Sequence, residues 1–344
     1  MENAINKIDG KGGATWAVKQ LGSAAYKSLA IGLAAMCALT ALADQDSCLQ
    51  DKISHAPGNV TVDELRASCG VAAARDDTRS VTQRRITAER QSVDRAFSIT
   101  AHKPNLILPA TYNDTPNTAP FDAIGEQGAV EELEAIIQVS VKFPLVNDLF
   151  NRRNDIFFAY TTRAWWQAYN SELSKPFRET NYEPEVFLRH YGGPSAMGLA
   201  LAHWDIGYVH QSNGRSQALT RSWDRLFART MIDIGSELSL MLESWYRLPE
   251  SKKHDEPPRE YQYFGYGQMR FIYANRKNTY TYTWRPGTKK QSSELTWSYP
   301  LSRHFRFYVS YFHGYGESLL DFSARTERIG IGFAVNDFLL AEQW

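Results

Sequence analysis

Hydrophobic and polar positions alternate along most of the chain beyond about residue 104. The clearest case lies near the end, where apolar residues alternate with small or polar ones: Ile329-Gly330-Ile331-Gly332-Phe333-Ala334-Val335-Asn336. A period of two indicates β-strands, and turn residues separate one such segment from the next. We predict twelve strands, at residues 105–112, 134–144, 156–167, 182–191, 197–211, 221–233, 238–247, 261–274, 278–286, 291–299, 304–313 and 326–338. The pattern therefore predicts an all-β fold with an even number of strands.

Two neighbouring segments, 197–211 and 221–233, are predicted to form a hairpin that carries candidate chemistry. If the chain reverses near Gln217, residues whose numbers sum to about 434 lie opposite each other. That register sets His210 opposite Asp224, and Ser212 shares a strand face with His210 because the two are two residues apart. A base, a nucleophile and a carboxylate would then meet, as they do in serine hydrolases.

The two faces of this hairpin differ in polarity. The residues that share a face with His210 are mostly apolar, namely Ala200, Ala202, Trp204, Ile206 and Tyr208 on the first strand and Leu226, Ala228 and Ile232 on the second. The alternate face holds His203, Asp205, Arg225, Arg229 and Asp233. A charged inner face and an apolar outer face are typical of a transmembrane β-barrel. The predicted catalytic groups would face lipid, which makes the lipid itself the expected substrate.

The connections between strands alternate between short and long. Residues 275–277 and 300–303 are short turns, whereas 248–260 and 314–325 are long and polar. Short turns are typical of the periplasmic end of a bacterial barrel and long loops of its outer end. The hairpin loop at 214–219 is then expected to open outward, with the site near the outer leaflet. Two acidic residues of the last loop, Glu317 and Asp321, are expected to be solvated.

Composition agrees with this fold class. The chain has 38 Lys and Arg against 38 Asp and Glu, a formal net charge of zero, so no electrostatic argument favours nucleic acid as a partner. It also contains 18 Tyr, 17 Phe and 9 Trp in 344 residues. This content suits the aromatic girdles of a membrane barrel, although a carbohydrate-binding β-protein could have a similar composition.

The amino-terminal part differs from the rest. Lys19 and Lys27 precede an apolar segment at 28–42, which ends in small residues, and we predict a secretory signal peptide at 1–43. A short membrane anchor is the alternative. Residues 44–103 have helical character and clustered charge, and we expect a periplasmic extension that is partly helical or disordered, followed by a barrel domain at 104–344. The sequence leaves open whether Cys48 and Cys69 form a disulfide bond.

Four segments carry a resemblance to a known family. They are Ser174-Lys175-Pro176-Phe177-Arg178-Glu179-Thr180-Asn181-Tyr182-Glu183-Pro184, His210 to Ser216 with Arg221-Ser222-Trp223, Ser298-Tyr299-Pro300, and Gly314-Tyr315-Gly316-Glu317-Ser318-Leu319. On these residues the chain resembles the outer membrane phospholipase A family from about residue 130 to Phe338. The resemblance implies a twelve-stranded transmembrane β-barrel in the bacterial outer membrane. It also implies a calcium-dependent esterase, activated by homodimerisation, that cleaves phospholipids and lysophospholipids with A1, A2 and lysophospholipase activity.

The resemblance assigns roles to the hairpin residues. Ser212 matches the nucleophile and His210 the general base, while Asp224 stands where the family usually has Asn. A carboxylate also accepts the imidazole N–H, so this difference is chemically conservative. The N–H of Gly214, together with a calcium-bound water, matches the family's oxyanion hole.

The implied metal is one Ca²⁺ per active site, shared across the dimer. Its ligands map onto the carbonyl of Arg215, the side chain of Thr220, where the family has Ser, and the carbonyl of Ser174 of the partner subunit. The threonine hydroxyl keeps an oxygen ligand for calcium. Thr162 stands where the family places a Gln in the dimer interface.

The rival interpretation is a non-catalytic outer-membrane pore or structural barrel. In that case His210 and Ser212 would be remnants, and Asn213 with Gly214 would only shape the reverse turn, since Asn-Gly is a common turn pair. The rival predicts ion conductance and no labelling of Ser212 by a sulfonyl fluoride.

Overall fold

The structure is a computed structural model, which describes residues 52, 68, 79–93, 98–171, 176–249, 259–275, 277–302 and 304–337. The chain divides into two compact units, residues 1–76 and 77–344, and every element below belongs to the second. The predicted signal peptide at 1–43 lies outside the described residues, as do Cys48 and Cys69. Among the helices that the structure describes, none combines the length and hydropathy needed to cross a membrane.

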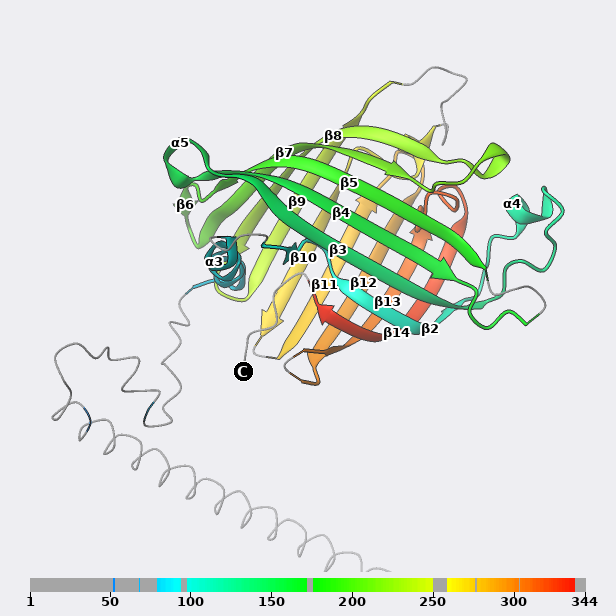
Figure 1. The fold of residues 1–344 in the computed structure, drawn as a ribbon, viewed down its shortest axis with the longest axis horizontal. Coiled ribbons are helices and arrows are strands. Elements are labelled where there is room, and N and C mark those ends of the chain that lie inside the picture. Colours follow the sequence, from blue (N-terminus) through cyan, green and yellow to red (C-terminus); the bar gives the residue numbers. More distant parts are fainter. Residues whose placement is uncertain are drawn as a thin grey trace, which may run out of the picture. The chain divides into compact units, whose positions relative to one another are not determined.

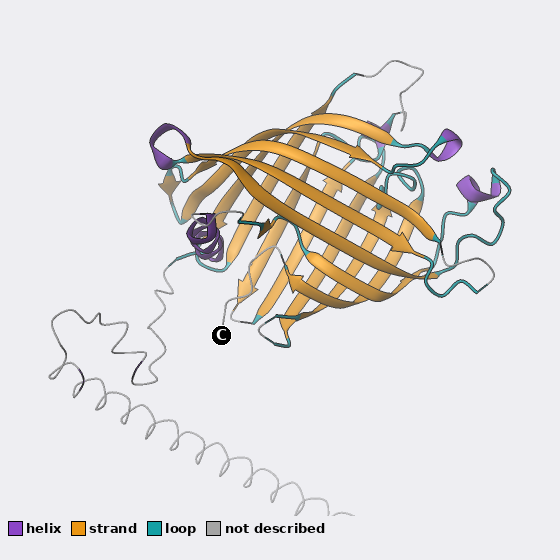
Figure 2. Ribbon diagram, viewed as in Figure 1, coloured by secondary structure: helices purple, strands orange, loops and turns teal. Residues whose placement is uncertain are grey.

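The described chain forms a closed antiparallel β-barrel (Figures 1 and 2). Its twelve long strands are β2 (Asn105–Asn113), β3 (Leu133–Asp148), β4 (Asn154–Trp166), β5 (Phe177–Tyr191), β7 (Leu199–Ser212), β8 (Ser222–Ile234), β9 (Leu238–Arg247), β10 (Gly267–Asn275), β11 (Asn278–Pro286), β12 (Gln291–Pro300), β13 (Arg306–Tyr315) and β14 (Arg325–Asn336). Each long strand pairs with the next, and β14 pairs with β2 to close the ring. The predicted twelve-stranded barrel is confirmed.

Short elements surround this ring. Two-residue strands β1 (Thr100–Ala101) and β6 (Ser195–Ala196) pair with β3 and β7. The helices are α3 (Val81–Val93), α4 (Ala119–Asp122), α5 (Leu149–Arg152) and the 3₁₀ turns η1 (Gln217–Leu219) and η2 (Glu260–Gln262). Figure 1 shows α3 and α5 at one end of the barrel and α4 at the other.

The predicted strand at 261–274 is wrong over its first six residues, which form η2 and a turn before β10 begins at Gly267. Phe264 packs inside the barrel, where its ring stacks on Trp223 with centroids 4.9 Å apart. Gly265 follows with φ +69°, and a Cβ there would collide with the Pro286 carbonyl oxygen. Packing against a distant strand therefore sets the turn, which local alternation does not reveal.

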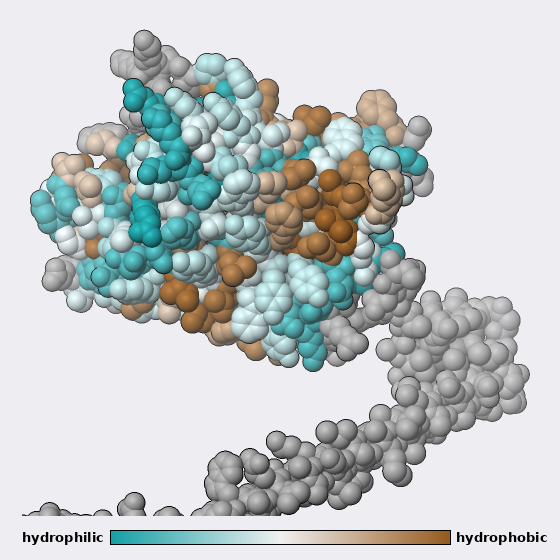
Figure 3. Space-filling view, turned by 180° about the vertical axis from the view of Figure 1, so that it is seen from behind, coloured by the Kyte–Doolittle hydropathy of each residue, from teal (hydrophilic) through white to brown (hydrophobic). Residues whose placement is uncertain are grey.

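Side chains alternate between the two faces of the barrel wall as predicted. Large apolar residues such as Ile206 and Leu226 are about half exposed on the outside, and Figure 3 shows apolar side chains gathered in patches on the surface. Ala202 and Ala200 are exceptions: Ala202 is buried against Met231 and Met241 inside the barrel, and Ala200 pairs with the buried, inward Asp233. A β-bulge between Leu201 and His203 shifts the register there and turns both Ala202 and His203 inward.

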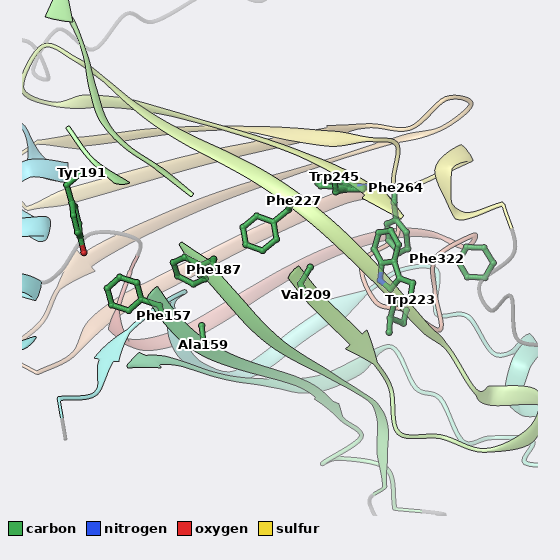
Figure 4. Close-up of a cluster of buried hydrophobic side chains, with 11 residues drawn as sticks. Phe157, Ala159, Phe187, Tyr191, Val209, Trp223, Phe227, Trp245, Phe264 and Phe322 are labelled. Atoms are coloured by element: carbon green, nitrogen blue, oxygen red, sulfur yellow. The ribbon is translucent and has the colours of Figure 1, made fainter. Parts of the chain in front are cut away.

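The interior combines an aromatic cluster with ion pairs. Figure 4 shows the cluster, which comprises Phe157, Ala159, Phe187, Tyr191, Val209, Trp223, Phe227, Trp245, Phe264, Leu319 and Phe322. Beside it, Arg229 forms ion pairs with Asp205, Glu185 and Glu243 at 2.7–3.4 Å. Buried guanidinium and carboxylate groups need such partners. A polar lumen inside an apolar shell is therefore present, as the sequence pattern indicates.

Hydrogen bonds and an ion pair hold helix α3 against the inner wall at one end of the barrel. Just before it, the Ser80 hydroxyl donates to Asp233 of β8 at 2.5 Å, and Thr82 shares a hydrogen bond with Ser239 of β9 at 2.8 Å. Glu89 forms an ion pair with Lys142 of β3, also at 2.8 Å. The helix thus contacts strands from separate parts of the ring.

Candidate active site

The hairpin of β7 and β8 has the predicted register. His210 pairs with Asp224 and Ser212 with Ser222, so the numbers of opposed residues sum to 434. The side chains of His210 and Asp224 are 38% and 30% exposed on the outer face. Their neighbours Val209 and Trp223 are buried in the interior cluster (Figure 4). The alternation of the two strands therefore presents the candidate catalytic groups to the outside of the barrel.

His210 and Asp224 are hydrogen-bonded. The distance from Nδ1 of His210 to Oδ1 of Asp224 is 2.8 Å. This contact fixes the imidazole so that Nε2 is free to take a proton from a hydroxyl. Ser212 lies two residues further along the same face, and within the described chain its hydroxyl has no side-chain hydrogen bond. The Ser212 hydroxyl can turn about the Cα–Cβ bond toward His210. A catalytic hydrogen bond of this kind often forms fully only when substrate is bound.

The loop between the strands is held by Asn213, which is buried. Its Oδ1 accepts hydrogen bonds from the backbone N–H groups of Arg215 at 3.2 Å and Arg221 at 2.9 Å. Its amide group donates to the carbonyl of Leu219 at 2.8 Å and to Glu179 at 3.3 Å. Asn213 therefore has a structural role in this loop.

Gly214, the candidate oxyanion residue, has φ +63°. Glycine adopts this left-handed conformation without the strain that a Cβ causes. A Cβ here would also lie 3.0 Å from Cε2 of Tyr182, on the neighbouring strand β5. The backbone conformation thus favours glycine, and a Cβ would also require the Tyr182 ring to move by a few tenths of an ångström.

Two of the three predicted calcium ligands lie together. The Thr220 hydroxyl donates to the Arg215 carbonyl at 3.1 Å, so two oxygens are already paired. The guanidinium of Arg215 donates to the carbonyls of Phe177 and Arg178 at 2.7 Å each, which ties this loop to the start of β5. Ser174, the third predicted ligand, precedes that strand in the sequence and lies outside the described residues.

The oxygens at this loop suit a hard cation. Calcium accepts carbonyl and hydroxyl oxygens at flexible geometry. The described ranges contain no group of three or more His, Cys, Asp or Glu side chains placed to hold a metal. A cation bound here would therefore depend on the carbonyl of Arg215 and the hydroxyl of Thr220, and these residues fit calcium.

One row of outward residues crosses four strands through the site. Tyr182 of β5 pairs with both Thr162 of β4 and Ser212 of β7, and Ser212 pairs with Ser222 of β8. The position predicted to lie in a dimer interface is therefore on the same face and in the same row as the candidate nucleophile.

An ion-pair network behind the site was not predicted. Arg178 contacts Glu134 at 3.0 Å and Asp321 at 2.6 Å, and Arg328 contacts Glu134 and Glu317 at 2.6 and 2.8 Å. The expectation that Glu317 and Asp321 are solvated is wrong, since both carboxylates are buried against guanidinium groups. Burial alone would raise the pKa of Asp321, but the charge of Arg178 outweighs it and holds that pKa below its usual range.

Tyr208 was also missed as a member of the site. Its hydroxyl donates to Oδ1 of Asp224 at 2.5 Å. The available signal was its position, two residues before His210 on the same strand face, but nothing in the sequence separates this tyrosine from the other outward aromatics.

Comparison with known proteins places these features in a family context. The family model described as phospholipase A1 matches residues 82–335. A relative in Neisseria meningitidis is 35% identical over 253 residues, which cover 70% of this chain and 66% of that protein. The phospholipase A1 of Escherichia coli strain K12 is 34% identical, over 72% of this chain and 84% of that protein. The solved outer membrane phospholipase of Salmonella typhi, described as a dimer with bound calcium, is 29% identical with a TM-score of 0.69, over 74% of this chain and 99% of that one.

Proposed function

Because this chain belongs to the phospholipase A1 family and is an integral β-barrel of the outer membrane, we propose that it is a calcium-dependent serine esterase of membrane lipids. It would hydrolyse the acyl ester bonds of phospholipids and lysophospholipids, with A1, A2 and lysophospholipase activity. The observation that carries this proposal is the His210–Asp224 hydrogen bond of 2.8 Å beside Ser212, on the face of the barrel that meets lipid.

The mechanism follows from these three side chains. Ser212 attacks the ester carbonyl while Nε2 of His210 takes its proton, and Asp224 stabilises the imidazolium that forms. The N–H of Gly214 is the proposed donor to the tetrahedral oxyanion. His210 then returns the proton to the leaving alcohol, and water, activated in the same way, releases the fatty acid from Ser212.

The Arg215 carbonyl and the Thr220 hydroxyl, 3.1 Å apart, are the proposed calcium ligands of this chain, with the carbonyl of Ser174 supplied by the partner subunit. When bound there, calcium supplies positive charge beside the developing oxyanion. The outward row that joins Thr162 to Ser212 supports a dimer whose interface lies next to the site. A monomer is then expected to be nearly inactive.

The test uses the full chain in detergent with phospholipid micelles, in calcium and in a chelator. Ser222→Ala is a matched control, because Ser222 lies directly opposite Ser212 on the same face. We expect Ser212→Ala to lose at least about 1,000-fold in kcat and Ser222→Ala to stay within about threefold. A sulfonyl fluoride should label Ser212 in the wild type.

Calcium-dependent release of fatty acid by Ser212→Ala at the wild-type rate would remove Ser212 as the nucleophile. Stable channel conductance in planar bilayers, together with no fatty acid release, would favour the rival pore.

A further inference from the structure

Asp224 accepts hydrogen bonds from two side chains at a single oxygen. Nδ1 of His210 lies 2.8 Å from Oδ1, and the hydroxyl of Tyr208 lies 2.5 Å from the same atom. A short O–H···O distance of about 2.5–2.7 Å is typical of a bond to an ionised carboxylate. The two donors come from one strand face, since Tyr208 and His210 are two residues apart on β7.

The surroundings of Asp224 explain why a second donor is needed. Along the outer face, Leu226 in the row next to Asp224 and Ile206 in the row beyond it are 49% and 56% exposed, so this part of the face presents apolar surface to the membrane. A carboxylate beside lipid is costly unless its oxygens are hydrogen-bonded. The remaining charged neighbour, Arg225, points to the lumen, where its guanidinium lies 3.9 Å from the ring centre of Trp223. Tyr208 therefore offers the hydrogen bond that lipid cannot.

We propose that Tyr208 is a positioning residue for the reaction, whose hydroxyl holds the Asp224 carboxylate in place for His210. This inference rests on the proposed function and adds a fourth side chain to the site. Tyr208 acts through Asp224 and has no role in bond making. It fixes the side-chain rotamer that aims Oδ1 at the imidazole, and it spreads the negative charge of the carboxylate, which favours the ionised form.

The direction of the pH effect follows from that role. Without the hydroxyl, the carboxylate charge is less stabilised, so the His210–Asp224 pair binds its proton more tightly. The form with a free imidazole base then appears only at higher pH. The acidic limb of the kcat/KM profile should therefore move to higher pH in Tyr208→Phe, and KM should hardly change because Tyr208 is not a substrate ligand.

Tyr311→Phe is the matched control. Tyr311 donates to Glu327 at 2.8 Å on the outer face of β13 and β14, across the ring from β7. It therefore loses the same kind of phenol–carboxylate bond at a site that has no catalytic group. We expect Tyr208→Phe to lower kcat about fivefold to tenfold and Tyr311→Phe to leave it unchanged.

The Asp224→Asn background separates the proposed role from a merely structural one. A neutral amide has no charge to stabilise, so Tyr208→Phe should shift no pH limb there and should change kcat by less than about twofold. An equal loss of kcat in both backgrounds, with no shift of the limb in either, would overturn the inference and assign Tyr208 to packing alone.

Different measurements test the esterase activity and the role of Tyr208. A wild-type protein that releases no fatty acid, or a Ser212→Ala variant that still releases it, overturns the proposed function and this inference with it. An active wild type whose Tyr208→Phe variant matches Tyr311→Phe in rate and pH profile overturns only the role of Tyr208.

Discussion

Single residues decide the shape of the loop that carries the proposed oxyanion donor. Gly214 has φ +63° and borders the ring of Tyr182, whereas Gly235, in the turn between β8 and β9, has φ +69° and open space within 4 Å of where a Cβ would stand. The two glycines share the same backbone requirement and differ in what surrounds them. They form a natural pair for separating local strain from damage to the site.

We expect Gly214→Ala to lower kcat about 100-fold or more, because the added methyl group displaces the loop from Tyr182 and with it the backbone N–H. Gly235→Ala should keep wild-type activity, although each substitution costs about 1 kcal/mol of backbone strain. Lipase assays and heat denaturation of both variants test this. Similar activity in the two variants would argue against a role of Gly214 in the oxyanion hole.

At this scale the sequence predicts only part of the site. The opposition of His210 and Asp224 follows from counting along a hairpin, because strand pairing is regular. The hydrogen bonds of Tyr208 and Asn213 cannot be predicted by the same counting, because each side chain could reach several polar partners in the loop or on neighbouring strands. The burial of Asp321 depends on Arg178, 143 residues earlier, a contact that no local pattern encodes.

Helix α3 shows how one element depends on a charged residue. Glu89 is 4% exposed and contacts Lys142 at 2.8 Å, Arg85 at 2.8 Å and Arg189 at 3.7 Å. Burial on its own would raise the pKa of Glu89, but these three cations outweigh it and hold that pKa well below its usual range. The ionised carboxylate therefore stabilises the packing of α3 against the barrel wall.

Glu89→Gln should lower the free energy of unfolding by about 3 kcal/mol at neutral pH, because the buried Lys142 and Arg189 and the partly exposed Arg85 lose their counter-charge. Since the folded pKa is lowered, the wild-type advantage is present above the unfolded value of about 4.5 and is lost as the pH falls below it. Denaturation of the wild type and of Glu89→Gln between about pH 3 and pH 8, a range that includes the unfolded pKa of a glutamate, measures the difference in their free energies of unfolding. Glu126→Gln, on an exposed loop, is the control. A difference that stays constant down to the lowest pH would contradict the assignment.

The strands were largely predictable as elements, because alternation reports the two faces of a barrel wall. The predicted bounds of β9 and β11 agree with the structure, 238–247 and 278–286. The bulge at Ala202 and the turn at Phe264 were not predictable, since neither the register shift between Leu201 and His203 nor the stacking of Phe264 on Trp223 has a local sequence pattern. A bulge changes the face of every residue beyond it in the strand. One local irregularity therefore limits how far alternation along the sequence predicts which residues face inward.

On the scale of the whole molecule, the proposed dimer divides the outer surface into a part that contacts the partner subunit and a part that contacts only lipid. Thr162 lies in the row of Ser212, whereas Leu295 of β12 lies on the outer face across the ring. An arginine on a lipid-facing position costs about 2–4 kcal/mol at the centre of the membrane, whichever strand bears it. The cost of placing an arginine in the membrane thus applies to both Thr162→Arg and Leu295→Arg. Only the substitution at Thr162, next to the site, should affect dimer assembly.

We expect Thr162→Arg to reduce calcium-dependent crosslinking and kcat at least tenfold, since a buried unpaired charge in an interface costs several kcal/mol. Leu295→Arg should dimerise and turn over lipid like the wild type. Crosslinking in detergent with and without calcium, alongside the lipase assay, compares them. Equal dimerisation by both variants would place the interface elsewhere.

The closing of the ring has a consequence for the order in which this protein matures. The hairpin of β7 and β8 joins residues that are near neighbours in the chain, so it can pair soon after it is made. The seam between β2 and β14 cannot, because the Arg328–Thr111 hydrogen bond that spans it links residues 217 apart. The hairpin that carries the proposed catalytic groups is therefore a local contact that can form early, while the wall that turns it toward lipid depends on this long-range pairing. A chain whose seam is still open would carry its proposed nucleophile before it had a closed membrane face on which to use it.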